Sequence, residues 1–132
     1  MDITVSRQQG RVPVTVFHIQ GDIDANTFDQ LEAQARQSIQ DGTRYLALDL
    51  SQVIYISSYG IRGISQIYTW LREAARDEND ADVSRGVRDG SYKSPHLKLV
   101  NPSPAVVKVM SATGLDMFLE FHSDLQGAVA SF

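Results

Sequence analysis

The chain has 132 residues, of which 42% are hydrophobic, and this length and composition fit one ordinary folded domain. Twelve basic residues against sixteen acidic ones give a net charge of −4, which argues against binding to nucleic acid or anionic lipid through a basic face. The absence of cysteine excludes disulfide bonds, thiolate nucleophiles and zinc–thiolate sites. No apolar run approaches the roughly 18 residues of a membrane helix, and the N-terminus does not resemble a signal peptide, so we expect a cytoplasmic protein without a membrane partner.

The first forty residues predict a β-hairpin followed by a helix. Apolar residues alternate with polar ones over residues 3–5 and 12–19, as in two strands joined by a turn. Asn26 or Thr27 can then cap a helix. The apolar face of that helix is formed by Phe28, Leu31, Ala35 and Ile39.

The middle of the chain predicts a buried strand, a second helix and a long loop. The short apolar run at residues 45–50 is typical of a strand in a parallel sheet. An apolar stripe at helical spacing predicts a helix over about residues 58–76, with Ser57 or Ser58 at its cap. Residues 77–95 have no apolar period and carry five acids and three bases, which amounts to half of the net charge. We therefore expect an inserted loop at about these residues.

The C-terminal part of the chain continues the alternation of strands and helices. It predicts a strand at residues 97–100, a helix that begins at Ser103–Pro104, a strand at residues 118–121 and a short final helix. Ser123 and Gln126 have the spacing of a capping box for this last helix. The sequence thus predicts an α/β fold, with a mixed, mostly parallel β-sheet covered by about four α-helices.

Nothing in the sequence indicates an enzyme. The three histidines, His18, His96 and His122, lie in or beside separate strands without metal-ligand spacing, so we expect each to be structural. There is no glycine-rich phosphate loop, and Ser57–Gly60 does not match a nucleophile elbow. We therefore predict no catalytic residues, no cofactor and no metal.

Two groups of polar residues fit a regulatory or binding role. Ser57 and Ser58 stand at a strand-to-helix turn, where a hydroxyl either caps the helix or accepts a phosphoryl group that the helix amides and dipole stabilise. Asp22 and Asp24 end a strand, and we expect them near that turn. Two carboxylates can bind Mg²⁺, but hard cations usually draw on more oxygen ligands, so capping or solvated carboxylates are the better interpretation.

Several blocks of the sequence, in the same order, resemble the signature of the STAS family, which includes the anti-sigma factor antagonists. The blocks are residues 21–27, similar to a G-E-[LI]-D-x-x-[TN] turn, residues 49–51, residues 55–62, similar to Y-I-[DS]-S-[SA]-G-[LI]-[RG], and residues 100–106 and 113–115. They cover the chain except for the expected loop, and the resemblance implies a single STAS domain over residues 1–132.

The resemblance implies a protein-binding module that is not an enzyme. Antagonists of this family sequester an anti-sigma factor that is also a serine kinase. The kinase phosphorylates the antagonist on the signature serine, which ends binding, and a PP2C-type phosphatase restores it. The match puts the phosphorylated serine at Ser58, with Ser57 as the alternative. It puts the partner-binding residues at Asp22, Asp24, Ser57, Ser58, Tyr59, Gly60 and Arg62.

Tyr59 departs from the family pattern, which has a small residue after the phosphorylated serine. Its ring either adds to the partner surface, where tyrosine is enriched, or hinders a kinase active site. The alternative hypothesis is therefore a STAS scaffold or an accessory subunit of a signalling complex or lipid-transport system without sigma-factor control. A nucleotide-binding protein or enzyme on the same frame is disfavoured, because a base, a metal cluster and a phosphate loop are all missing from the sequence.

Overall fold

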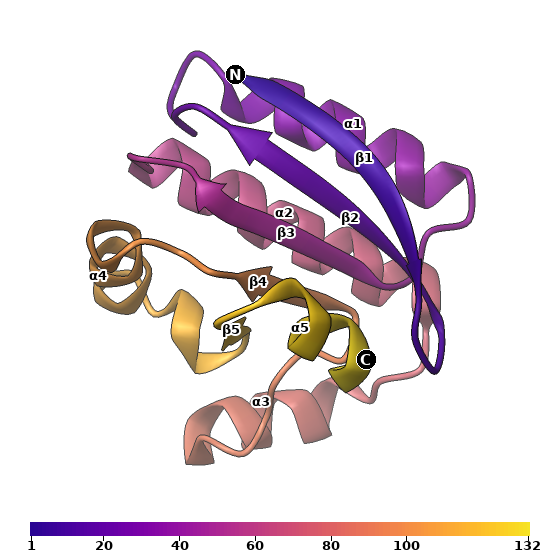
Figure 1. Ribbon diagram of the computed structural model, residues 1–132. Coiled ribbons are helices and arrows are strands. Elements are labelled where there is room, and N and C mark those ends of the chain that lie inside the picture. Colours follow the sequence, from indigo (N-terminus) through magenta and orange to yellow (C-terminus); the bar gives the residue numbers. More distant parts are fainter.

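Five strands form one mixed sheet in the computed structural model, which describes all residues 1–132 (Figure 1). They lie side by side in chain order: β1 (Asp2–Gln9), β2 (Pro13–Gln20), β3 (Leu46–Gln52), β4 (Leu97–Val100) and β5 (Glu120–His122). β1 pairs with β2 antiparallel, and every other neighbouring pair is parallel. The expected mixed, mostly parallel sheet is confirmed.

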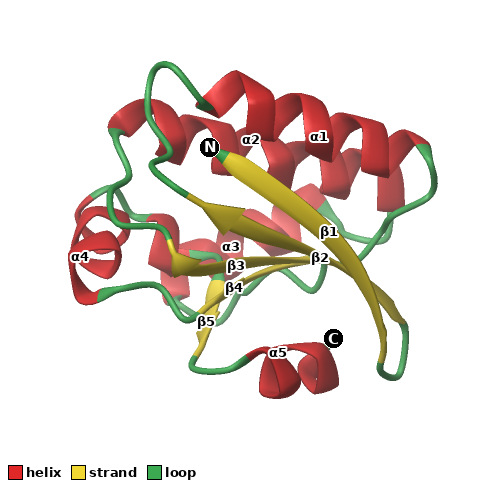
Figure 2. Cartoon of the chain, turned by 45° about the horizontal axis from the view of Figure 1, so that its top comes forward, coloured by secondary structure: helices red, strands yellow, loops and turns green.

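Five α-helices surround this sheet, one more than the sequence predicts. They are α1 (Phe28–Gln40), α2 (Ser58–Ala75), α3 (Asp80–Asp89), α4 (Pro104–Ala112) and α5 (Leu125–Ser131). Figure 2 shows α1 and α2 side by side on one face of the sheet and α5 on the opposite face. None of the helices combines the length and the apolar character that crossing a membrane requires.

The two faces of the sheet carry two separate hydrophobic cores. Successive residues of a strand point to opposite faces, so the neighbours Val16 and Phe17 belong to different cores. The larger core lies under α1 and α2 and contains the buried stripe Ile61, Ile64, Ile67 and Leu71 of α2. The smaller core, under α5, consists of Val14, Val16, Ala47, Val100, Ala128 and Val129.

The predicted loop at residues 77–95 is wrong, because residues 80–89 form α3. The Asn79 side chain caps this helix by accepting hydrogen bonds from the amides of Ala81 and Asp82 at 2.9 and 3.1 Å. Gly90 ends it in the left-handed conformation, with φ of 82°. Both ends therefore carry the usual cap residues, and these were the available sequence signals.

The sequence of α3 shows no apolar stripe at helical spacing because of the way this helix packs. Val83 and Gly86 are its buried residues, so a glycine occupies a position where an apolar side chain would have marked the stripe. A Cβ added at Gly86 would lie 2.7 Å from Cβ of Tyr92, so the close approach requires glycine. The Tyr92 ring in turn packs edge-on against Tyr68 of α2, and their hydroxyls are hydrogen-bonded at 3.1 Å.

The C-terminal elements differ in detail from the prediction. Asp124, not Ser123, caps α5, and its carboxylate accepts from the Gly127 amide at 2.6 Å. The last strand begins at Glu120, because the amide of Leu119 is still bonded within the short 3₁₀ turn that precedes it.

Candidate functional site

The start of α2 is fixed against the turn that follows β2. Ile23 and Ile56 form an isolated parallel bridge. The Ile23 amide donates to the carbonyl oxygen of Tyr55 at 3.0 Å, and the Ile23 carbonyl accepts from the Ser57 amide at 2.9 Å. These bonds place the Asp22–Asp24 turn beside the serine pair, as the sequence predicts.

Gly60 makes this junction possible. A Cβ added there would lie 2.5 Å from the carbonyl oxygen of Ile23 and 2.7 Å from Cγ1 of Ile56. Contacts that short do not occur between real side chains and backbone, so any larger residue must push α2 away from the turn. Gly60 is buried, and its direct role in the structure is to let the two elements meet.

The two serines have different surroundings. Ser57 is the N-cap of α2, is half-buried, and accepts a hydrogen bond from the Gly60 amide at 3.4 Å. Ser58 is the first residue of the helix and is exposed. The capping function that the sequence predicts for one of the pair thus belongs to Ser57.

Three large apolar side chains within four residues of Ser58 in the sequence face solvent. Ile54, Tyr55 and Tyr59 are 80%, 52% and 45% exposed, and we call them the apolar patch. The Tyr59 ring packs at a tilt against Phe28 of α1 with 5.6 Å between centroids, and the Arg62 guanidinium lies 6.0 Å from the Tyr59 centroid. The motif match missed Ile54. Ile54 lies between the buried residues Val53 and Ile56 in an apolar run, so the sequence does not indicate that its side chain is exposed.

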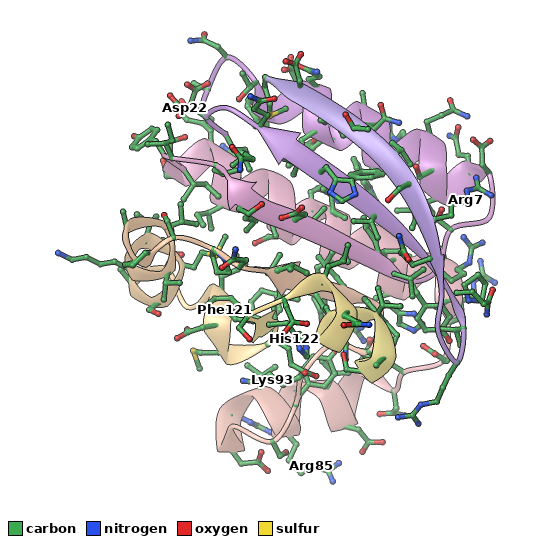
Figure 3. All side chains as sticks on the ribbon, viewed as in Figure 1. Arg7, Asp22, Arg85, Lys93, Phe121 and His122 are labelled. Carbon is green, nitrogen blue, oxygen red and sulfur yellow. The ribbon has the colours of Figure 1, made fainter.

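The two aspartates of the turn are not equivalent. Asp24 is half-buried, and its carboxylate accepts from the Asn26 amide at 2.9 Å. The Thr27 hydroxyl accepts from the Asp24 amide at 2.9 Å and donates to the Asp22 carbonyl at 2.8 Å. Asp22 is exposed, at the edge where β2 ends (Figure 3). Asp24 thus shapes the turn, in line with the capping interpretation, whereas Asp22 presents its charge to solvent.

A polar cluster on β2 and β3 lies behind this edge. His18 Nδ1 is 2.8 Å from the Asp49 carboxylate, which also accepts from the Ser51 hydroxyl at 2.7 Å. Partial burial by itself raises the pKa of Asp49, but the hydrogen bonds from Ser51 and His18 outweigh it and hold that pKa below 3.8. His18 and Asp49 therefore link two neighbouring parallel strands, which fits a structural role.

A second polar cluster has no counterpart in the sequence prediction. Asp77, Glu78 and His96 each bring a ligand atom within 4.8 Å of the other two. His96 directly precedes β4, and the two acids directly follow the end of α2. No motif spacing reveals this group, because α3 separates its members along the chain.

A family model described as the STAS domain matches residues 4–77. The chain belongs to the STAS domain family. The matched residues run from β1 to the end of α2 and include the turn after β2 and both serines of the signature. The match ends where the segment that contains α3 begins.

Solved structures share the whole fold of this STAS protein. A candidate anti-sigma factor antagonist from Thermotoga maritima is 16% identical with a TM-score of 0.72, covering 96% of this chain and 90% of that one. An anti-sigma factor antagonist from Mycobacterium paratuberculosis is 22% identical (TM-score 0.68; 98% and 93% covered). Bacillus SpoIIAA in its phosphorylated form is 16% identical (TM-score 0.64; 97% and 96% covered). These likenesses establish the fold. A search of curated protein sequences found no match.

Proposed function

We propose that this STAS protein is an anti-sigma factor antagonist, a non-enzymatic module that sequesters an anti-sigma factor serine kinase while Ser58 is unphosphorylated. Phosphorylation of Ser58 by that kinase ends binding, and a PP2C-type phosphatase restores it, all in the cytoplasm. One observation carries the proposal: exposed Ser58 stands in the first turn of α2, between the exposed Tyr55 and Tyr59 in the sequence, and the start of this helix is bonded to the Asp22–Asp24 turn.

The apolar patch supports a protein partner. Exposed aromatic side chains with a charged residue beside them are typical of the centre and rim of a protein interface. Tyr59 is held by Phe28 and carries Arg62 over its ring, so it adds an ordered surface next to Ser58. This arrangement favours a binding role for Tyr59 over steric hindrance of the kinase.

The hydrogen bonds of the two serines support Ser58 as the modified residue. The Ser57 hydroxyl is the acceptor that caps α2, and a phosphoryl group there would have to displace a half-buried cap. Ser58 needs no such rearrangement because it is exposed. A phosphate at the first turn of a helix is also stabilised by the helix amides and dipole.

The consequence of phosphorylation follows from charge. A phosphoserine adds about −1.5 to −2 charges at neutral pH. At Ser58 this charge would appear within the apolar patch and close to exposed Asp22, so a partner that buries the patch would lose affinity. Each tenfold loss needs about 1.4 kcal/mol, so a few kcal/mol suffice to release the complex.

The test compares wild type, Ser58→Ala and Ser58→Asp as baits, with Ser57→Ala as the matched control. We expect wild type, Ser58→Ala and Ser57→Ala to capture a protein kinase, identified by mass spectrometry, and Ser58→Asp to lose it. The captured kinase and ATP should then phosphorylate wild type and Ser57→Ala on Ser58. Full phosphorylation of both single alanine variants would contradict the assigned site.

The alternative function is a STAS scaffold or accessory subunit of a signalling or lipid-transport assembly. The observation that favours it is α3, which adds surface beyond the matched family region. Capture of transporter subunits or other STAS proteins by all four baits, with no kinase, would support this alternative.

A further inference from the structure

The cluster of Asp77, Glu78 and His96 lies at the far end of α2 from Ser58. α2 has 18 residues and so extends about 27 Å at about 1.5 Å per residue. The proposed switch stands at its first residue, and the two acids follow its C-cap. The cluster is therefore separate from the proposed partner surface, and its function is independent of it.

The contacts of His96 define which ring nitrogen faces the acids of the cluster. Nδ1 is 2.8 Å from the carbonyl oxygen of Arg44, which can only accept, so Nδ1 carries a proton and donates it. Nε2 is hydrogen-bonded to the carboxylate of Asp77, with both oxygens at 2.9 Å. Two acceptors thus face one imidazole whose side chain is 3% exposed. A metal ion held by Nε2 and the Asp77 carboxylate would replace the hydrogen bond between them.

A metal-bound histidine has this same pattern of contacts. Histidines that ligate through one nitrogen usually donate the other N–H to a backbone carbonyl or carboxylate, which fixes the tautomer. The Arg44 carbonyl supplies that partner here. The Tyr45 ring also stacks on His96 with 5.1 Å between centroids, which holds the plane of the imidazole.

Glu78 provides the second, independent observation. Its Oε1 is buried without a hydrogen-bond partner, and the side chain is 10% exposed. The nearest cation is the Arg72 Nε at 4.0 Å, and the guanidinium of Arg72 pairs with Asp80. A buried carboxylate oxygen without a donor is costly, so a bound cation would relieve it.

We propose that Asp77, Glu78 and His96 form a binding site for a divalent transition-metal ion, with zinc as the reference ion. One imidazole nitrogen and two carboxylate oxygens are ligands that zinc accepts, whereas calcium and magnesium prefer oxygen alone. Ligand bonds of about 2.1 Å put neighbouring ligand atoms about 3–4 Å apart. The 2.9 Å between His96 Nε2 and the Asp77 oxygens is close to that spacing, and cluster atoms that lie farther apart, up to 4.8 Å, would move closer together to share one ion.

The ion would fasten the two ends of the α3 segment to each other. Asp77 and Glu78 precede α3, and His96 follows it, so one ion contacts the chain on both sides of the helix. It would also neutralise two acids in the most acidic part of the sequence. Metal that binds the native state alone raises stability in proportion to the logarithm of its concentration.

The test titrates zinc chloride into the untagged, chelator-treated full chain by isothermal titration calorimetry, followed by thermal unfolding with and without zinc. We expect one zinc per chain, a higher Tm with zinc, and weaker binding of magnesium. Asp77→Asn and Glu78→Gln should each weaken zinc binding at least tenfold and abolish the rise in Tm. The apo Tm of each variant, measured in chelator, shows that it is folded.

Two matched controls test whether zinc binds elsewhere. Asp82→Asn removes one acid from α3 outside the cluster, and Glu120→Gln removes the carboxylate that contacts His122 at 3.0 Å. Both should bind zinc as wild type does. The proposal is overturned if wild type binds no zinc or if Asp77→Asn and Glu78→Gln bind it undiminished. It is also overturned if NMR shows His96 protonated on both nitrogens with and without zinc.

Discussion

The Ser57 amide donates to the carbonyl oxygen of Ile23 at 2.9 Å, so the cap of α2 is bonded directly to the turn after β2. This bond joins the two sequence blocks that carry the proposed partner surface, although more than thirty residues separate them. Changes that move one block should therefore alter the other.

Replacing Gly60 tests this junction. Gly60→Ala places a Cβ 2.5 Å from the Ile23 carbonyl, and we expect a loss of about 1–3 kcal/mol in the free energy of unfolding, as for other overpacked sites. Gly63→Ala is the matched control in the same helix, because its added Cβ would be no closer than 3.6 Å to its neighbours. It should gain up to about 1 kcal/mol from helix propensity. Urea denaturation measures both, and equal stabilities would refute the packing argument.

The Thr27 hydroxyl should contribute more to the stability of the folded protein than the Thr27 methyl group. Thr27→Val keeps the shape but removes the oxygen that accepts from the Asp24 amide and donates to the Asp22 carbonyl. We expect it to cost about 1–3 kcal/mol, since it leaves polar groups unpaired. Thr27→Ser retains the hydroxyl and should cost less. Chemical denaturation of both variants checks the order, and the reverse order would contradict it.

The cap of α3 can be tested locally. Asn79→Ala removes the acceptor for the Ala81 and Asp82 amides and should destabilise the helix by about 1 kcal/mol. Asn79→Asp keeps an acceptor and serves as the control. Amide hydrogen exchange should show faster exchange across α3 in Asn79→Ala alone. Unchanged protection there would mean that the cap is dispensable.

Asp49 should make stability depend on acid pH. Because its pKa is lower in the folded protein than the ordinary 3.8, its contribution is complete above that value and is lost as the pH falls through the folded pKa. Asp49→Asn should therefore be less stable than wild type at neutral pH, and the gap should narrow below about pH 4. Urea unfolding across this range measures it, with exposed Asp22→Asn as the charge-matched control. A gap that stays constant with pH would contradict the linkage.

Much of the fold follows from periodic patterns in the sequence. The hairpin, the α2 stripe and the Ser103–Pro104 helix start are local signals, and each has its counterpart in the structure. α3 has cap residues at both ends but no apolar period, because Gly86 takes the place of an apolar residue against Tyr92. Its stability depends on packing against a ring that lies outside the helix.

The site residues divide in the same way. The family motif identifies Asp22 and Ser58 in the sequence, and the Ile23–Ile56 bridge brings the two segments that contain them together. Asp77 precedes α3 and His96 follows it, so the two residues meet only because the segment that contains α3 folds back. No local sequence pattern indicates that the two ends of this segment lie close together. Contacts between residues that are distant in the sequence are thus the features of the site that the sequence does not predict.

The connection between β3 and β4 contains two helices, α2 and α3, where parallel strands usually need one. The entropy of closing a longer connection grows only logarithmically, about 0.6 kcal/mol per doubling, so equilibrium stability changes little. The effect falls on folding speed, because contacts between distant residues form late. We expect the pairing of β3 with β4 in the centre of the sheet to be the slow event in folding, and a shorter connection would accelerate it.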